Sequence, residues 1–373
     1  REASNYSQRS VVMAPRGMVS ASHHLATLSG YRILSIGGNA VDAAVAMTSV
    51  LNVVEPHSAG LGGDAFALIY MAKEKKLYGM NASGHSPYAA DISSIKSRGF
   101  NQMPERGPLS ITVPGALNGW VEAVKKYGRL DISEIFKDAI FYAEQGFPVT
   151  EVIAGEWKNA AKILRSHPGG HAYLDNGKAP EPGDVFRNES LGRTYRRIIE
   201  DGAETFYGGD LSQKIAKFIQ NHDGLLTEKD FQDHKTTWVE PICSDYRDYT
   251  IYELPPNGQG ITALQMLNIL EGYNLRAMKH NSAEYLHLLI EAKKIAFSDR
   301  DYYITDPLFE QVPVSQLGSK TYAEKCRKKI EHDKAMDIPI NHPFYTPSSE
   351  TVYVTAVDEE RNAVSLISSI YMH

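Results

Sequence analysis

The feature that most limits the fold of this chain is a helix-forming segment that is apolar on nearly every side. It runs from Ala40 to Val53 and is rich in alanine and valine. Asn39, just before it, is a favourable N-cap residue, and Asp42 lies in the first turn, where the helix dipole favours a negative charge. A helix without a polar face belongs in the interior of a protein, against a sheet. The sequence therefore predicts that this helix lies in the core.

Hydrophobic residues follow both the helical and the strand period along the chain, which is typical of a mixed α and β protein. Strands are expected at 65–70 and 248–253, and amphipathic helices at 133–146 and 211–220. Two further helix starts have capping signals. Thr262 with Gln265 matches a capping box for a helix to about Leu270. Ser282 is expected to cap a helix through Asp299, with an apolar face made of Leu286, Leu289, Ile290 and Ile295.

Charge and hydropathy exclude two classes of partner. The 373 residues have a formal net charge of −6, and phosphate binding needs a basic surface, so no nucleic-acid partner is expected. No run of about 18 apolar residues occurs, so no membrane span is expected. The printed N-terminus has no apolar segment typical of a secretory signal. We expect a cytoplasmic protein, with export after removal of a signal as the alternative.

Several motifs that carry chemistry in other proteins have simpler explanations here. Cys243 and Cys326 lack metal-ligand spacing and are expected to be buried free thiols, with a disulfide between them as the alternative. The histidines show no metal-ligand pattern either. The glycine loop at 60–65 matches a dinucleotide fingerprint, but that fingerprint requires a following helix, and here a strand follows. The acidic run 358–360 is interpreted as a solvated turn.

The printed chain ends in a predicted β-hairpin. Its parts are a strand at 351–357, a turn at 358–362 and a strand at 363–371. If Val357 pairs with Ala363, then Thr351 lies directly opposite Ser369, with the two Cβ atoms about 5 Å apart. Both faces of the first strand are apolar, so we expect both to be buried. The two faces comprise Val352, Val354 and Ala356 on one side, and Tyr353, Thr355 and Val357 on the other.

A threonine at the start of this hairpin has a chemical interpretation. Thr351 follows a proline-rich stretch, 338–350, that we interpret as an exposed linker. A chain cut before Thr351 would give it a free α-amine, which can act as the base for its own hydroxyl. A purely structural threonine is the alternative, because β-branched residues favour strands.

Several motifs in this order resemble the γ-glutamyltranspeptidase family of N-terminal-nucleophile hydrolases. The matching segments are Ile36 to Ala46, Gly60 to Phe66, Pro255 to Gly260 with Leu264 to Leu270, and Thr351 to Tyr371. The resemblance implies an α+β fold, the four-layer αββα sandwich. It also implies one composite domain in which 1–350 is the large-subunit region and 351–373 begins the small subunit.

The resemblance assigns roles to individual residues. Thr351 matches the nucleophile, which autocleavage between Glu350 and Thr351 would free, and Ser369 matches the hydroxyl residue that orients it. The substrate-binding positions differ from the family. Ser83 stands where an arginine is expected, His85 is the best substitute for that arginine, and Tyr371 stands where the family has asparagine.

Two further departures from the family lie in the hairpin. Tyr353 replaces the usual histidine two residues after the nucleophile, and Arg361 replaces a glycine before Asn362. The nucleophile is thus retained while its surroundings differ from those of the family.

The resemblance implies a γ-glutamyltransferase or hydrolase acting through a threonine ester on a small amide. A glutaryl or cephalosporin acylase-like enzyme, or a poly-γ-glutamate-processing amidase, is one alternative, and an unprocessed scaffold or binding subunit is another. No metal or organic cofactor is expected. The expected partner is the remainder of the small subunit beyond His373, which would supply the oxyanion site, and a homo-oligomer is allowed.

Overall fold

The computed structural model describes residues 10–337 and 351–371. These residues form two compact units, one comprising 10–76, 82–236 and 351–371, the other 77–81 and 237–337. Glu350 and the stretch 338–350, interpreted above as a linker, lie outside the described residues. No helix among the described residues is long and apolar enough to cross a membrane.

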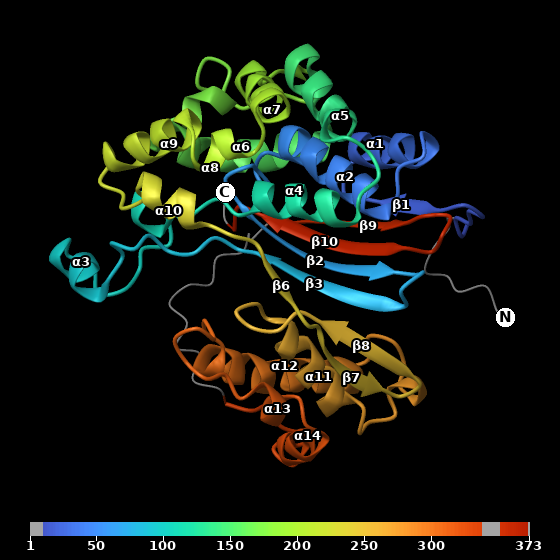
Figure 1. The fold of residues 1–373 in the computed structure, drawn as a ribbon. Helices are drawn as coiled ribbons and strands as arrows, with labels where there is room; N and C mark the ends of the chain where they lie inside the picture. Colours follow the sequence, from blue (N-terminus) through green and yellow to red (C-terminus); the bar gives the residue numbers. More distant parts are fainter. Residues whose placement is uncertain (1–9, 338–350, 372–373) are drawn as a thin grey trace. The chain divides into compact units, whose positions relative to one another are not determined.

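The first unit combines helices with the strands of the main sheet (Figure 1). Its longer elements are β1 (Met18–Ser20), α1 (His24–Ser35), α2 (Ala40–Val54), β2 (Asp64–Met71), α4 (Ala116–Tyr127), α5 (Ile132–Gln145), α6 (Glu151–Ser166), α7 (Glu189–Asp201), α9 (Asp210–Gln220), β9 (Val352–Val357) and β10 (Ala363–Ser369). Shorter elements are α3 (Ile92–Ser97), β4 (Phe147–Pro148), β5 (Val185–Phe186), α8 (Glu204–Tyr207) and α10 (Glu228–Asp233). The predicted helices at 133–146 and 211–220 correspond to α5 and α9.

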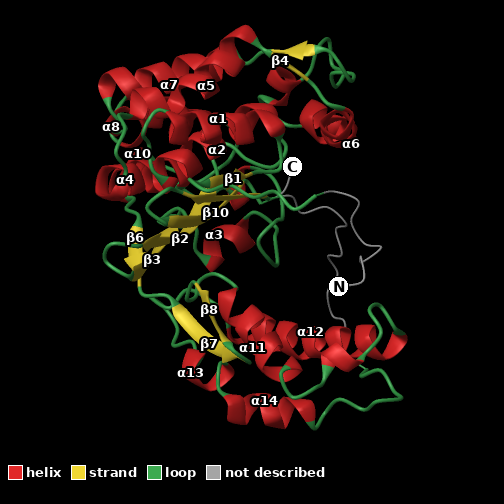
Figure 2. Ribbon diagram, turned by 90° about the vertical axis from the view of Figure 1, so that its right-hand side faces the viewer, coloured by secondary structure: helices red, strands yellow, loops and turns green. Residues whose placement is uncertain are grey.

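The apolar helix α2 is the centre of this unit. All of its residues are buried, and Asn39 and Asp42 form a capping box at its start, as the sequence predicted. On one side α2 contacts strands β9 and β10, and on the other it contacts α1 and α5. Figure 2 shows these helices layered above the strands. The helix therefore joins the sheet to the outer helices.

Strands β1, β9, β10 and β2 lie side by side in this order, all antiparallel. The predicted hairpin register is confirmed, because Ala363 pairs with Val357 and Ser368 with Val352. On its other edge β10 pairs with β2, which places Ser369 opposite Asp64. The two strands that follow residue 350 thus lie between two strands that precede it.

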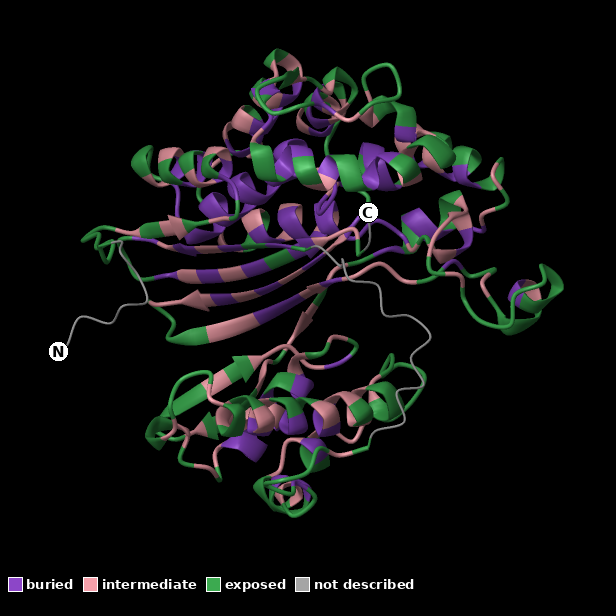
Figure 3. Ribbon diagram, turned by 180° about the vertical axis from the view of Figure 1, so that it is seen from behind, coloured by how far each residue is buried: buried purple, intermediate pink, exposed green. Residues whose placement is uncertain are grey.

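Burial differs between the two faces of these strands (Figure 3). The face toward α2 is buried, with Val352, Val354 and Ala356 each at most 1% exposed. The expectation that both faces are buried is wrong for the described residues. On the opposite face Tyr353 is 51% exposed and Ile367 is 39% exposed, because α2, the helix of this unit that packs on both strands, covers only the other face.

The interpretation of the 358–360 turn as solvated is wrong for its first residue. Asp358 is only 4% exposed. Its carboxylate accepts hydrogen bonds from the backbone N–H of Ala40 (3.1 Å) and from the backbone and side-chain N–H groups of Asn362 (3.0 and 2.9 Å). Asp358 therefore ties the hairpin turn to the N-terminus of α2, where the helix dipole favours a negative charge.

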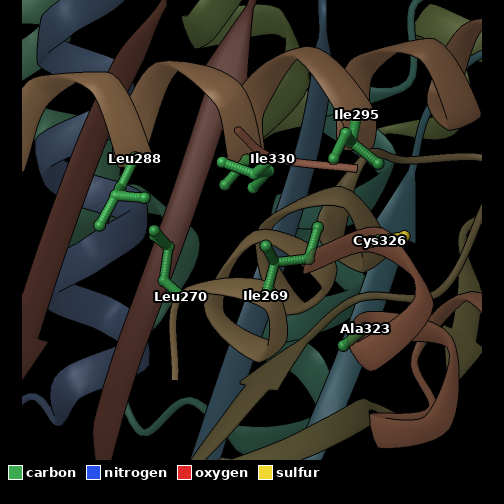
Figure 4. Packing of buried hydrophobic residues seen from close by; sticks show 8 residues of the cluster. Ile269, Leu270, Leu288, Ile295, Ala323, Cys326 and Ile330 are labelled. Carbon is green, nitrogen blue, oxygen red and sulfur yellow. The ribbon is translucent and has the colours of Figure 1, made fainter. Parts of the chain in front are cut away.

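The second unit comprises β3 (Lys76–Ala82), β6 (Thr237–Val239), the hairpin of β7 (Ile242–Tyr246) and β8 (Tyr249–Glu253), and helices α11 (Gly260–Leu270), α12 (Ala283–Tyr303), α13 (Val314–Leu317) and α14 (Lys320–Arg327). Helices α11, α12 and α14 enclose an apolar core that includes Ile269, Leu288 and Cys326 (Figure 4). The strand predicted at 248–253 corresponds to β8.

Two predictions for this unit are wrong in detail. Helix α11 begins at Gly260, so Thr262 lies inside the helix and does not cap it, and the side chain of Gln265 bonds Asp299. Ser282 does cap α12. The apolar face of α12, however, contains Leu288 and Ile295, whereas Leu286 and Ile290 are 40% and 51% exposed.

The cysteines and histidines of the described residues offer no metal site. Both cysteines are free, but only Cys326 is buried and Cys243 is exposed, which corrects the expectation that both are buried. No group of three or more histidine, cysteine or acidic side chains is arranged to hold a metal ion within 10–337 and 351–371.

Candidate active site

Thr351 and Ser369 meet at the open end of the β9–β10 hairpin. The Thr351 hydroxyl donates a hydrogen bond to Ser369 Oγ at 3.1 Å, and Thr351 is exposed. Ser369 Oγ also accepts the backbone N–H of Tyr371 at 2.8 Å. Both lone pairs of the Ser369 hydroxyl are therefore in use, which fixes its position beside Thr351. The contact expected from the hairpin register is present.

The same row continues onto β2. Asp64 lies directly opposite Ser369 in the β10–β2 pair, so both side chains are on the same face of the sheet, with Cβ atoms about 5 Å apart. Gly63 lets the two strands approach here, because a Cβ on Gly63 would lie 2.1 Å from the carbonyl oxygen of Ser369. Ser369 on β10, Asp64 on β2 and Thr351 directly before β9 thus form one row, which we call the Thr351 row.

Asp64 in turn holds the segment that follows β3. The backbone N–H of Gly84 donates to Asp64 Oδ1 at 2.8 Å. Gly84 has no space for a side chain, since a Cβ there would lie 1.6 Å from the carbonyl oxygen of Val113. Ser83 and His85 flank this glycine, so the structure places both predicted substrate-binding positions next to the Asp64 end of the Thr351 row. Ser83 is half-buried.

His85 belongs to a cluster of rings. Its ring lies 5.3 Å from that of Tyr88 and 6.1 Å from that of His234, between centroids. Its Nδ1 contacts the carbonyl oxygen of Ser86 at 2.8 Å, whereas its buried Nε2 has no hydrogen-bond partner among the described residues. His234 stacks on Tyr207, and burial lowers the pKa of His234 to about 4, so His234 is neutral near pH 7.

The electrostatics of Asp64 are unusual for a carboxyl group. Removal from water raises its pKa to about 6, and the single hydrogen bond from Gly84 only partly opposes this shift. Burial also raises the pKa of Tyr207. Tyr207 lies close enough to Asp64 for the negative charge of Asp64 to add to that shift. The Tyr207 hydroxyl donates to the carbonyl oxygen of Pro114 and accepts the N–H of Asn118. Tyr207 is thus fixed beside Asp64 by neutral partners.

The positions at which this chain differs from the resembled family have clear local structures. Tyr371 has a left-handed backbone (φ +74°) and is 69% exposed. Arg361, in the hairpin turn, is also left-handed (φ +69°), a conformation that glycine adopts without strain and that asparagine adopts more readily than most residues. The hydroxyl of Tyr353 lies 2.8 Å from Ser365 Oγ on the exposed face.

Sequence reasoning assigned no role to Asp64. A signal existed, because aspartate is depleted in strands, and Asp64 stands at the first position of β2 directly after glycines. Its place became clear only when β10 was found to pair with β2, a pairing between residues about 300 positions apart. Of the predicted residues, the structure brings the Thr351 hydroxyl and the backbone N–H of Tyr371 into contact with Ser369 Oγ. It also places Ser83 and His85 next to Asp64.

A hairpin whose first residue is a threonine bonded to a serine hydroxyl, beneath a buried helix, is the arrangement expected of an N-terminal-nucleophile hydrolase. A model of the gamma-glutamyltranspeptidase family matches residues 26–373. The chain belongs to this family. The predicted α+β class is confirmed with it.

Relatives and solved structures agree with this assignment. The glutathione hydrolase-like YwrD proenzyme of Bacillus subtilis (strain 168) is 39% identical, covering 96% of this chain and 68% of the relative. The acylase ACY 1 proenzyme of Pseudomonas sp. (strain V22) is 35% identical, covering 95% and 65%. The chain thus spans about two thirds of the length of these relatives.

The cephalosporin acylase from Bacillus halodurans is 39% identical with a TM-score of 0.89, covering all of this chain and 69% of that one. Helicobacter pylori gamma-glutamyltranspeptidase is 28% identical with a TM-score of 0.83, covering 91% of this chain and 100% of that one. The likeness to these proteins extends over both units of the chain.

Proposed function

We propose that this protein is a γ-glutamyl amide hydrolase or transferase that works through Thr351 after cleavage of the Glu350–Thr351 bond. The observation that carries this proposal is the hydrogen bond between Thr351 and Ser369 at the open end of the hairpin. Family membership and the relatives called proenzymes support it.

Maturation would begin with the hydroxyl of Thr351. Its oxygen attacks the Glu350 carbonyl carbon, the peptide C–N bond breaks, and the nitrogen takes up a proton to become the free α-amine. The resulting ester is then hydrolysed by water, which leaves a carboxylate on Glu350 and restores the Thr351 hydroxyl. The new α-amine has a reference pKa of about 7.7–8.0, which suits a general base near neutral pH.

Turnover repeats the same chemistry on a substrate. The α-amine accepts the hydroxyl proton while Thr351 Oγ attacks the substrate carbonyl, and the leaving amine takes that proton. Water or an acceptor amine then releases the acyl group from the ester. Ser369 orients the nucleophile in both reactions, and the remainder of the small subunit is the proposed source of the oxyanion donors.

A second candidate keeps this chemistry but uses a glutaryl or cephalosporin amide, or a poly-γ-glutamate chain. The observation in its favour is Ser83, because a serine at that position offers no guanidinium fork for the α-carboxylate of a γ-glutamyl group. Relatives named as acylases support this candidate as well.

The test compares the full-length protein with its Thr351→Ala and Thr351→Ser variants by intact mass and by amide turnover. We expect the wild type to yield two fragments separated before Thr351, and Thr351→Ala to yield neither fragments nor turnover. Thr351→Ser should retain part of both, because it keeps the hydroxyl and loses only the methyl group that restricts χ1. Cleavage or turnover by Thr351→Ala would exclude Thr351 as nucleophile, and an uncut inactive wild type would favour a scaffold.

A further inference from the structure

The second unit has a pocket that the chemistry at Thr351 does not use. Its volume is about 430 Å³, which lies within the range of sites that bind small molecules. The turn between β7 and β8, the segment 275–280 that precedes α12, and Tyr285 in the first turn of α12 contribute its lining. All of these residues belong to the second unit, so the pocket is formed within one compact part of the chain.

The floor of this pocket is apolar and part of its wall is aromatic. Leu275 and Met278 line the pocket and also pack against the apolar core of the second unit. The Met278 N–H donates to the carbonyl oxygen of Leu275 at 3.3 Å, which holds the two residues together. Tyr246, Tyr249 and Tyr285 add their rings to the lining. Such a surface suits the flat, apolar body of a ligand, because aromatic rings stack on one another.

The charged side chains of the lining all have the same sign. Arg247 and Arg276 line the pocket and no aspartate or glutamate does, although the protein as a whole has a net charge of −6. Within 10–337 and 351–371 the side chain of Arg276 has no hydrogen-bond or ion-pair partner. A guanidinium group that lacks a carboxylate partner can bind a carboxylate or a phosphate through two parallel hydrogen bonds. The pocket is therefore suited to an anion.

Arg247 is held in place at the turn between β7 and β8. Its backbone is left-handed (φ +56°), and its backbone N–H donates to Glu271 Oε1 at 2.7 Å. Its guanidinium lies over the ring of Tyr246, 5.3 Å from the centroid, and donates to the carbonyl oxygen of Tyr273 at 3.3 Å. An arginine side chain has five N–H donors, so this group is positioned by the protein and still has donors for a ligand.

We propose that this pocket binds a small ligand that combines a flat ring with a carboxylate or phosphate group. The ring packs against the tyrosines and the apolar floor, and the charged group bonds to Arg247 and Arg276. The site goes beyond the proposed function and does not depend on it, because Thr351 and Ser369 both belong to the other unit. No covalent bond is made or broken in the pocket.

The experiment measures the dissociation constants of three probes for the full-length protein by fluorescence anisotropy. The probes are naphthoate, naphthyl phosphate and the uncharged naphthamide, all substituted at the same ring carbon. We expect both anions to bind saturably and about tenfold more tightly than the amide, because hydrogen bonds between ions are stronger than neutral ones. The tighter of the two anions identifies the charged group that the pocket prefers. Added salt should weaken the anions and leave the amide unchanged.

Two variants separate the contribution of charge from that of the ring. Arg276→Met should weaken both anions about tenfold and leave the amide unchanged. Tyr249→Ala removes a ring that is 71% exposed, and should weaken all three probes by a similar factor, about three- to tenfold. The matched controls are Arg16→Met, exposed and outside the lining, and Tyr252→Ala, on the same strand β8 and also outside the lining. Both should bind all three probes as the wild type does.

Three results would each overturn the proposal. The first is that neither anion binds saturably to the wild type. The second is that naphthamide binds as tightly as the anions, since the arginines would then have no part in binding. The third is that Arg276→Met binds the anions as tightly as Arg16→Met does, because the anions would then bind elsewhere. Thermal unfolding of each variant verifies that its fold is intact, and amide turnover at Thr351 is not needed for any of these measurements.

Discussion

The open and closed ends of the β9–β10 hairpin each have an aspartate, and the protein surrounds the two very differently. At the closed end Asp358 is 4% exposed and accepts three hydrogen bonds, from Ala40 and Asn362. At the open end, across from Ser369, Asp64 accepts one bond, from Gly84, and its pKa is raised to about 6. A carboxylate that receives several donors from the protein contributes to the fold, whereas one that receives few is costly to ionise where water is partly excluded.

The largest effect is expected at the closed end. Asp358→Ala removes three hydrogen bonds and leaves buried N–H groups without partners, which should lower the free energy of unfolding by about 3 kcal/mol. Urea unfolding measures the change. Glu359→Ala, on the same turn but exposed, is the matched control and should change stability little. A loss under 1 kcal/mol in Asp358→Ala would mean that Asp358 is not a structural anchor.

At the open end a substitution should increase stability. The native pKa of Asp64 lies above its unfolded value, so this group lowers stability progressively as the pH rises from about 4 through about 6. Asp64→Asn removes that effect and keeps the acceptor for Gly84. We expect a gain of about 2 kcal/mol in the free energy of unfolding at pH 7.5 and almost none at pH 4. An equal gain at both pH values would exclude ionisation as the cause.

Loss of the Ser369 hydroxyl should have a smaller effect. Ser369→Ala removes one neutral hydrogen bond to Thr351, worth about 1 kcal/mol, so self-cleavage and amide turnover should each slow about fivefold. Time courses by intact mass and initial rates measure the two steps. Ser365→Ala, on the same strand and face and bonded to Tyr353, should leave both rates unchanged. Equal slowing in the two variants would remove the special role of Ser369.

The smallest effect concerns the closed end again. Arg361 has φ +69° in the hairpin turn, a conformation that glycine adopts without strain. Arg361→Gly should therefore raise the free energy of unfolding by about 0.5 kcal/mol, since relief of strain is partly offset by the greater freedom of glycine in the unfolded chain. Thermal unfolding with and without the substitution measures this. A decrease in stability would indicate that the side chain of Arg361 contributes more than its backbone costs.

Local patterns predicted the parts of the structure that depend on neighbours in sequence. The cap of α2, the period of the strands and the hairpin register all follow from residues within one or two turns of each other, and the register alone placed Thr351 against Ser369. The mixture of helical and strand patterns along the chain, together with the resemblance to a known family, predicted the α+β fold class.

Contacts between distant segments could not be predicted in this way. The burial of Asp358 depends on Ala40, more than 300 residues earlier, and an acidic run gives no local sign of it. The face of α12 was wrong because Leu286 and Ile290 fit the helical period as well as Leu288 does, and only the position of the neighbouring helices decides between them. Asp64 was overlooked for the same reason, since its partner strand follows 300 residues later.

The position of β9 and β10 has a consequence for a chain that is cut before Thr351. Both strands are interior, with β1 on one side and β2 on the other, and both flanking strands come from the part of the chain before the cut. Severing one peptide bond therefore removes no strand from the sheet, and the two pieces stay associated until the sheet itself unfolds. The Thr351–Ser369 contact forms only once β9 and β10 have paired, so the proposed self-cleavage gains its orienting hydroxyl only after these strands have folded together.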